Sequence, residues 1–198
     1  DSSGVLWRLA RVYVCMADVA PVEQQIDLYR HAEEYAQRCI HADSSISEGH
    51  AWRAAALGNI AMSEGGKTKV NLTHVIKHEL EAAIALDPGN DIAYSILGSF
   101  YLALGNVSWI ERQLANIFLG SLPDGGYEEA EQALRKAIAI APNVVRHHFE
   151  LGRVYMEMDR AREAMKEFRL AISLPVQLGV DRHTQESAEQ LMEEIKEE

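Results

Sequence analysis

Apolar residues recur three and four positions apart through most of the chain and seldom alternate with polar residues. This period is typical of amphipathic helices, whereas a half-buried strand would show strict alternation. The run AIALDPGN at 83–90 returns as AIAIAPN at 137–143 and, less faithfully, as AISLP at 171–175. Since proline cannot continue a helix, each run is expected to end one. The pattern therefore predicts an all-α protein.

The same signature starts the next helix after each of the first two prolines, as YxxLGxxY at 94–101 and HxxLGxxY at 148–155. A repeat of about 34 residues with helix–turn–helix units is the tetratricopeptide pattern. Gly98 and Gly152 are 54 positions apart, so about 20 extra residues interrupt this unit. We predict a helical solenoid of about four helix pairs with an inserted helix and a C-terminal capping helix.

The predicted single domain spans the whole chain, 1–198. Its units are expected at about 3–45, 46–88, 89–142 with the insertion at 107–126, and 143–175, followed by the capping helix at 183–198. The capping helix is predicted because the last unit of a stack has one face without a neighbour. Ala188, Leu191, Met192 and Ile195 form the apolar stripe that would cover this face.

The chain is acidic, with 19 Lys and Arg residues, 30 Asp and Glu residues and a formal charge of −11. Such a charge repels phosphate at long range, so no nucleic-acid partner is expected. No apolar run approaches the ~18 residues that a membrane-spanning helix needs. Because the sequence begins at Asp1 without methionine, an upstream signal or anchor that has been removed is kept as an alternative. The cytoplasmic side is the expected location, or the periplasm if a signal was removed.

Three segments resemble the regulator of microtubule dynamics family: LWRLAR at 6–11, IKHELEAAIALDPGND at 76–91 and WIERQLANIFLGSLPDGGYEEAEQALRKAIAIAPN at 109–143. The resemblance covers about 6–182, and its insertion is the most specific part because generic repeat proteins lack it. It implies a tetratricopeptide-like, non-catalytic binding module associated with microtubules. One member, anchored on the mitochondrial outer membrane, tethers it to the endoplasmic reticulum and binds and transfers phospholipid, so lipid is an implied ligand.

The first helix of each unit should line the concave face of the solenoid. Its exposed positions give a candidate site of arginines and apolar residues: Trp7, Arg11, Arg53, Leu57, Ile60, Leu102, Arg146, Phe149 and Arg153. An apolar groove with arginines suits a phospholipid or other amphiphile, because guanidinium binds phosphate or carboxylate with two hydrogen bonds. Alternatively, the aliphatic residues belong to the core and the arginines pair with acidic neighbours.

The insertion adds further candidate residues: Ile110, Leu114 and Ile117 fall on one helical face, with Phe118 adjacent to it and Trp109 at the start of the helix. This helix would lie over the groove or on a partner as a mobile lid. Alternatively, it packs permanently into the solenoid and enlarges the core.

The sequence offers no catalytic set, and we predict neither enzymatic activity nor a cofactor or metal. His74 and His78 share a helix face, but no further zinc ligands accompany them. Cys15 and Cys39 are expected to be free thiols, although a disulfide between them is the alternative. The predicted function is a module that binds a lipid or other amphiphile with an anionic head, with phospholipid transfer as a further expected activity. A scaffold for an apolar peptide or partner helix is the alternative.

Overall fold

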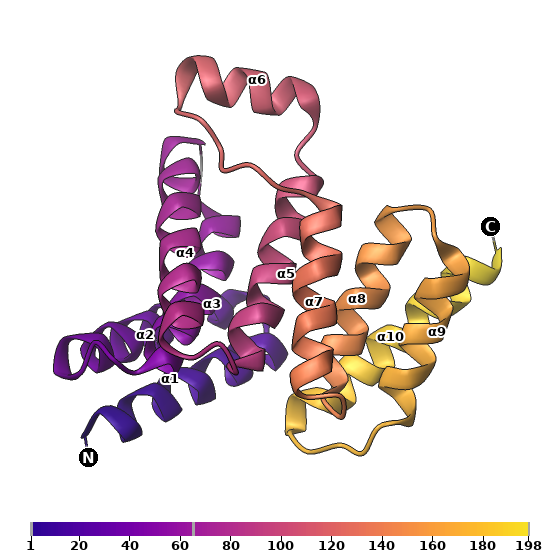
Figure 1. Ribbon diagram of the computed structural model, residues 1–198, viewed down its shortest axis with the longest axis horizontal. Helices are drawn as coiled ribbons and strands as arrows, with labels where there is room; N and C mark the ends of the chain where they lie inside the picture. Colours follow the sequence, from indigo (N-terminus) through magenta and orange to yellow (C-terminus); the bar gives the residue numbers. More distant parts are fainter. Residues whose placement is uncertain (1, 65, 198) are drawn as a thin grey trace.

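The computed structural model describes residues 2–64 and 66–197, a part of the chain that contains ten helices and no strand (Figure 1). The helices are α1 Ser2–Val19, α2 Val22–Ala42, α3 Ser47–Ser63, α4 Gly66–Leu86, α5 Asp91–Gly105, α6 Trp109–Phe118, α7 Tyr127–Ile140, α8 Val145–Glu157, α9 Ala161–Ser173 and α10 Gly179–Glu197. The all-α prediction is confirmed.

Four helix pairs stack side by side: α1 with α2, α3 with α4, α5 with α7, and α8 with α9. The first helices of successive pairs also contact one another, in the order α1, α3, α5 and α8. This is the predicted tetratricopeptide-type solenoid, with α6 as the inserted helix. The capping helix α10 begins at Gly179, four residues earlier than expected, and packs on α9, α8 and α1.

Two glycines at equivalent repeat positions allow the helices of a pair to approach closely. A Cβ atom added to Gly98 would lie 2.4 Å from Cγ of Leu134, and one added to Gly152 would lie 2.5 Å from a ring carbon of Phe168. Both distances are far below van der Waals contact, so no side chain fits there. The LG dipeptide of the repeat is therefore a packing feature of the α5–α7 and α8–α9 pairs.

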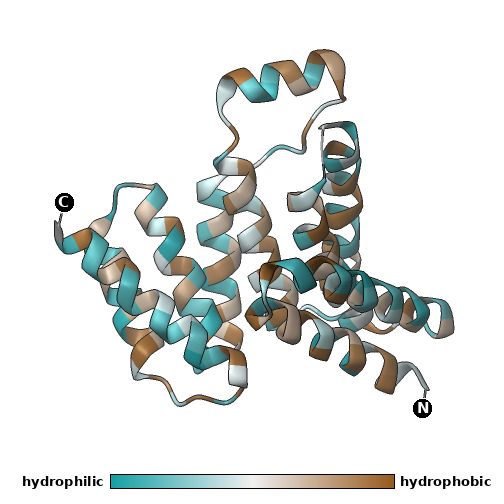
Figure 2. Cartoon of the chain, turned by 180° about the vertical axis from the view of Figure 1, so that it is seen from behind, coloured by the Kyte–Doolittle hydropathy of each residue, from teal (hydrophilic) through white to brown (hydrophobic). Residues whose placement is uncertain are grey.

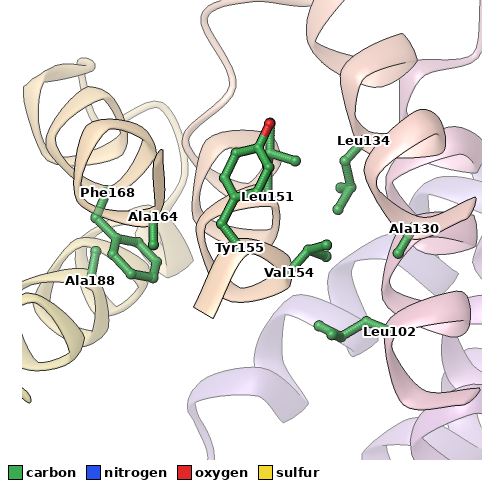
Figure 3. Packing of buried hydrophobic residues seen from close by; sticks show 9 residues of the cluster. All are labelled: Leu102, Ala130, Leu134, Leu151, Val154, Tyr155, Ala164, Phe168 and Ala188. Carbon is green, nitrogen blue, oxygen red and sulfur yellow. The ribbon is translucent and has the colours of Figure 1, made fainter. Parts of the chain in front are cut away.

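The C-terminal half encloses a continuous apolar core between α5 and α10 (Figure 3). Its buried members are Leu102, Ala130, Leu134, Leu151, Val154, Tyr155, Ala164, Phe168 and Ala188. Ala188 comes from α10 and is fully buried, and Figure 3 shows it beside Phe168 of α9. The capping helix is thus part of the core.

Two histidines, the partly buried His50 and the buried His148, make equivalent hydrogen bonds in different repeats. Nδ1 of His50 lies 2.6 Å from Oε2 of Glu79, and Nδ1 of His148 lies 2.7 Å from Oε2 of Glu167. In each ring, Nε2 faces the backbone carbonyl of the residue six positions earlier, Ser44 at 3.1 Å and Pro142 at 2.9 Å. A carbonyl only accepts, so Nε2 carries a proton, and the carboxylate favours a second proton on Nδ1.

Both rings are therefore held in the charged form. The hydrogen bond with Glu79 raises the pKa of His50 above its usual value. Burial lowers the pKa of His148, but the hydrogen bonds with Glu167 and Pro142 outweigh burial and leave this pKa raised as well. Since each pKa is higher in the folded than in the unfolded chain, the stabilisation is complete below the unfolded value and is lost as the pH rises through the folded one.

We expect the free energy of unfolding to decrease as the pH rises above about 6.5, where unfolded histidine releases its proton. Urea denaturation at a series of pH values measures this slope. Replacing both His50 and His148 by Gln should flatten it, whereas His41→Gln, at an exposed position of α2, should leave it unchanged. Equal slopes in the wild type and the double variant would contradict the assignment.

Candidate functional site

A cavity of about 600 Å³ lies between α1, α8 and the start of α10. The first turns of α3, α5 and α8 and the loop segments 87–90 and 177–178 complete its wall. Of the residues predicted from the sequence, Trp7, Arg11, Arg146 and Phe149 line this cavity. The curvature of the solenoid thus brings the first and last repeats to one site.

An ion pair links the two ends of the solenoid at this cavity. Nη1 of Arg146 on α8 lies 3.3 Å from Oδ2 of Asp18 on α1, and the Tyr29 hydroxyl donates to Oδ1 of Asp18 at 2.8 Å. Burial alone would lower the pKa of Arg146, but Asp18 and Glu150 outweigh it and keep the guanidinium charged. Burial and the neighbouring Asp18 raise the pKa of Tyr29. The predicted Arg146 is therefore already engaged with a carboxylate.

Arg53 and Arg153 do not line the cavity. Arg53 is held by two carboxylates, with Nε 3.1 Å from Glu33 and Nη1 2.6 Å from Glu79. Nη1 of Arg153 lies 3.1 Å from Glu150, one turn earlier on α8. The alternative in which the arginines pair with acidic neighbours applies to both.

Arg11 differs from the other three arginines, because no carboxylate of the described residues pairs with it. Its guanidinium lies beside Cys15, where burial raises the pKa of the thiol and the charge of Arg11 partly opposes this rise. Both cysteines are free thiols. Arg11 is thus the arginine of the cavity that remains available to an anionic ligand.

The cavity is more acidic than the sequence suggested. Six carboxylates line it, namely Asp18, Glu48, Asp87, Asp91, Glu150 and Asp181, against Arg11 and Arg146. Several of them hold the wall together: Asp181 accepts from the backbone N–H groups of Gln177 and Leu178, both at 2.8 Å, and Asp91 lies 2.8 Å from Nε2 of His147. The expectation of an arginine-dominated groove is therefore wrong.

The predicted aliphatic lining residues are also placed differently. Leu57 and Leu102 are 6% and 2% exposed and belong to the core. Ile60 is partly buried and packs against the N-terminal apolar cluster. All three face neighbouring helices: Leu57 and Leu102 pack against their own and the following repeat, whereas Ile60 packs against the preceding repeat.

A second, apolar groove of about 430 Å³ runs along α1 beside the start of α10. Its lining is Arg8, Arg11, Val12, Cys15, Met16, Val19, Leu178, Gly179 and Val180, of which Arg11, Cys15, Leu178 and Val180 also line the cavity. Sequence reasoning missed this α1 groove. The exposed Val12, Met16 and Val19, at i, i+4 and i+7 on α1, were the signal that could have found it.

The inserted helix α6 lies away from the cavity, apart from the helix pairs (Figure 2). Its predicted residues Trp109, Leu114 and Phe118 are exposed and line neither the cavity nor the α1 groove. The helix therefore neither covers the groove nor packs into the core, and the expectation that it lies on a partner stays a prediction.

Within the described residues, no group of three or more His, Cys, Asp or Glu side chains is placed to hold a metal ion. Nε2 of His74 is instead 2.7 Å from the Ser121 carbonyl, which joins α4 to the loop after α6. None of the helices in the described part of the chain combines the length and the apolar character that a membrane-spanning segment needs.

A sequence model of the family described as "Regulator of microtubule dynamics protein 1-3" matches residues 1–196. The chain belongs to this family. Human regulator of microtubule dynamics protein 2 is 26% identical over 198 residues, covering 99% of this chain and 48% of the relative. Mouse regulator of microtubule dynamics protein 1 is 28% identical over 195 residues, covering 97% of this chain and 64% of the relative.

This family member thus spans only about half to two thirds of the length of the curated relatives that it matches. Among solved structures, a thermophilic TPR protein of Thermus thermophilus aligns with a TM-score of 0.66 and 18% identity, over 95% of this chain and 81% of that chain. This likeness supports the tetratricopeptide-type fold. Family and fold together indicate a helical binding module.

Proposed function

We propose that this family member is a non-catalytic module that binds one elongated amphiphile in the cavity and the α1 groove. The observation that carries the proposal is the position of Arg11 where the two spaces meet, since no carboxylate in the described part of the chain pairs with this arginine. A phosphate or carboxylate would bind Arg11 by charge-assisted hydrogen bonds. An acyl chain would lie along Val12, Met16 and Val19, where each buried methylene contributes about 0.8 kcal/mol.

The remaining wall suits a head group that carries a donor or a positive charge beside its anion. Glu48 and Glu150 supply carboxylates, and Trp7, Trp52 and Phe149 supply aromatic side chains that attract cations. A zwitterionic phospholipid head combines both kinds of group. If the module removed such a phospholipid from one bilayer and delivered it to another, it would act as a lipid carrier.

The start of α8 supports binding of the anionic group at the same end of the cavity. Val144 and Val145 line the cavity, the N-cap Val144 makes no side-chain hydrogen bond, and the first turn contains no acidic residue. The partial positive charge at the start of a helix is therefore not neutralised by its own side chains. This partial charge adds to the charge of Arg11 and offsets part of the negative charge of the cavity wall.

The second candidate is a scaffold that binds an apolar peptide or a partner helix. The open α1 groove favours it, because such a groove can take the apolar face of an amphipathic helix. The cavity volume of about 600 Å³ lies in the range of small-molecule sites, however, which favours the amphiphile.

Replacing Arg11 by Glu is expected to weaken binding of fluorescent phosphatidic acid about tenfold or more, because a charge-assisted hydrogen bond becomes a repulsion. Diacylglycerol with the same chains should bind almost unchanged. Arg30→Glu is the matched control, since Arg30 is exposed on α2 beside Asp27. An equal loss of affinity for both lipids would show that Arg11 does not bind the head group.

Native mass spectrometry of protein purified from cells tests the proposal as a whole. A retained lipid would support it. A spectrum of empty protein, together with no uptake of either lipid, would reject it. Recovery of a stoichiometric protein in place of lipid would favour the scaffold.

A further inference from the structure

Helix α6 presents an apolar face to solvent, which the exposed Gln113 interrupts between Trp109 and Ile117. Trp109, Ile110, Leu114, Ile117 and Phe118 are each between 50% and 74% exposed. At 100° per residue, these five side chains fall within one half of the helix circumference. Ala115 is the buried residue of α6. A face of this width on a short helix in a protein of net charge −11 is an unusual exposure of apolar area.

The structure fixes α6 in this orientation. Ser108 and Glu111 form a capping box at its start. Arg112 donates from Nη1 to the Pro123 carbonyl and from Nη2 to the Leu104 carbonyl, both at 3.1 Å. Arg112 and Ala115 lie on the opposite side of the helix from the apolar face. These contacts lie on the side of α6 away from the apolar face, which is exposed.

The size and shape of this face favour a bilayer over a protein partner. Five half-exposed apolar side chains offer on the order of 600 Å², below the ~800 Å² per partner of a standard stable interface. A single projecting helix is also convex, and a bilayer adapts to it without a preformed groove. The aromatic residues Trp109 and Phe118 stand at the two ends of α6, and aromatic side chains favour the membrane–water interface.

The charge beside α6 points to the same partner. The first part of α4, residues 66–78, contains Lys67, Lys69 and Lys77 and no carboxylate. Lys67 and Lys69 are exposed. Hydrogen bonds with Ser108 lower the pKa of Glu111, and the charge of Lys69 contributes to this shift, so Lys69 lies close to α6. These exposed lysines are a local positive charge that favours anionic lipid head groups.

We propose that α6 docks this protein on a phospholipid bilayer, with its apolar face in the interface and Lys67 and Lys69 at the head groups. The helix would lie in the plane of the interface and would not span the membrane. This inference goes beyond ligand binding in the cavity. It also uses different residues, so the two can succeed or fail independently.

Flotation with phosphatidylcholine vesicles, with and without about a fifth of phosphatidylserine, tests the docking. The wild-type protein should float with the vesicles, and more strongly with phosphatidylserine. Ile117→Glu should weaken the partition about tenfold or more, because it places a charge at the centre of the apolar face. The matched control is Val22→Glu, at an exposed apolar position of α2.

A spectroscopic readout locates the contact. Trp109 is exposed, whereas Trp52 is buried and Trp7 is partly buried in the cavity wall. In a Trp7→Phe background, vesicles should therefore shift the tryptophan emission to the blue. The Trp109→Phe variant should lose this shift. Uptake of phosphatidic acid from detergent solution should be the same for Ile117→Glu and the wild type, which separates docking from the cavity.

Three results would overturn the docking proposal. The first is a wild-type protein that binds neither kind of vesicle. The second is an equal loss of binding in Ile117→Glu and Val22→Glu. The third is a wild-type dimer, or a stoichiometric protein complex, that Ile117→Glu disrupts while vesicles stay unbound.

Discussion

Phe168→Ala is expected to lower the free energy of unfolding by about 3–5 kcal/mol, as truncation of a buried aromatic residue usually does. Phe168 on α9 is fully buried and lies against Gly152 of α8. Its ring centroid is 5.9 Å from that of Phe149, which lines the cavity. The loss therefore combines transfer of the ring to water with a void between α8 and α9. Urea denaturation followed by circular dichroism measures it.

Leu170→Ala provides the control on the same helix, because Leu170 is exposed and leaves no void. We expect this variant to lie within about 0.5 kcal/mol of the wild type. If the two variants lost similar amounts, the core between α8, α9 and α10 would not be packed as described.

The repeat made the fold predictable from the sequence. The LG dipeptides at Gly98 and Gly152 and the prolines after the second helices reflect local requirements, namely close helix approach and helix termination. Such local requirements can be recognised from neighbouring residues in the sequence. The path of α10 cannot be recognised in this way, because it depends on how far the stacked pairs curve before the chain returns toward α1.

The candidate site was predicted less well, for a related reason. Periodicity within one helix separates inner from outer faces, but it does not say which helix of the next repeat covers a face. Leu102 is therefore core, packed in the same cluster as Leu134 and Val154. Likewise, nothing near Arg53 in the sequence reveals Glu33 and Glu79, which lie 20 and 26 positions away. Trp7 and Arg11 line the cavity because the curvature of the solenoid brings α8 and α10 back toward α1.

Glu79→Gln is expected to lower the free energy of unfolding by about 3–5 kcal/mol near neutral pH, the range for removing one partner of a buried ion pair. Glu79 is 5% exposed, and its two oxygens lie 2.6 Å from His50 Nδ1 and from Arg53 Nη1. The amide keeps the shape of the side chain but leaves His50 without its carboxylate and Arg53 with Glu33 alone. The loss thus measures charge pairing and not a void.

The pH dependence of this loss identifies its cause. Burial alone would raise the pKa of Glu79, but His50 and Arg53 outweigh burial and leave the pKa below its usual value. Its contribution is therefore present above about pH 4.3, where unfolded glutamate ionises, and is lost as the pH falls through the folded pKa. The difference between the wild type and Glu79→Gln should shrink in acid.

The matched control is Glu81→Gln on the same helix, because Glu81 is exposed and its nearest cation, Lys77, is 3.9 Å away. A surface pair of this kind contributes about 0–1 kcal/mol. Urea titrations of all three proteins between acid and neutral pH give the comparison. A Glu79→Gln loss that is no larger than that of Glu81→Gln, or that stays constant in acid, would mean that the buried cluster of α3 and α4 is not held together by charge.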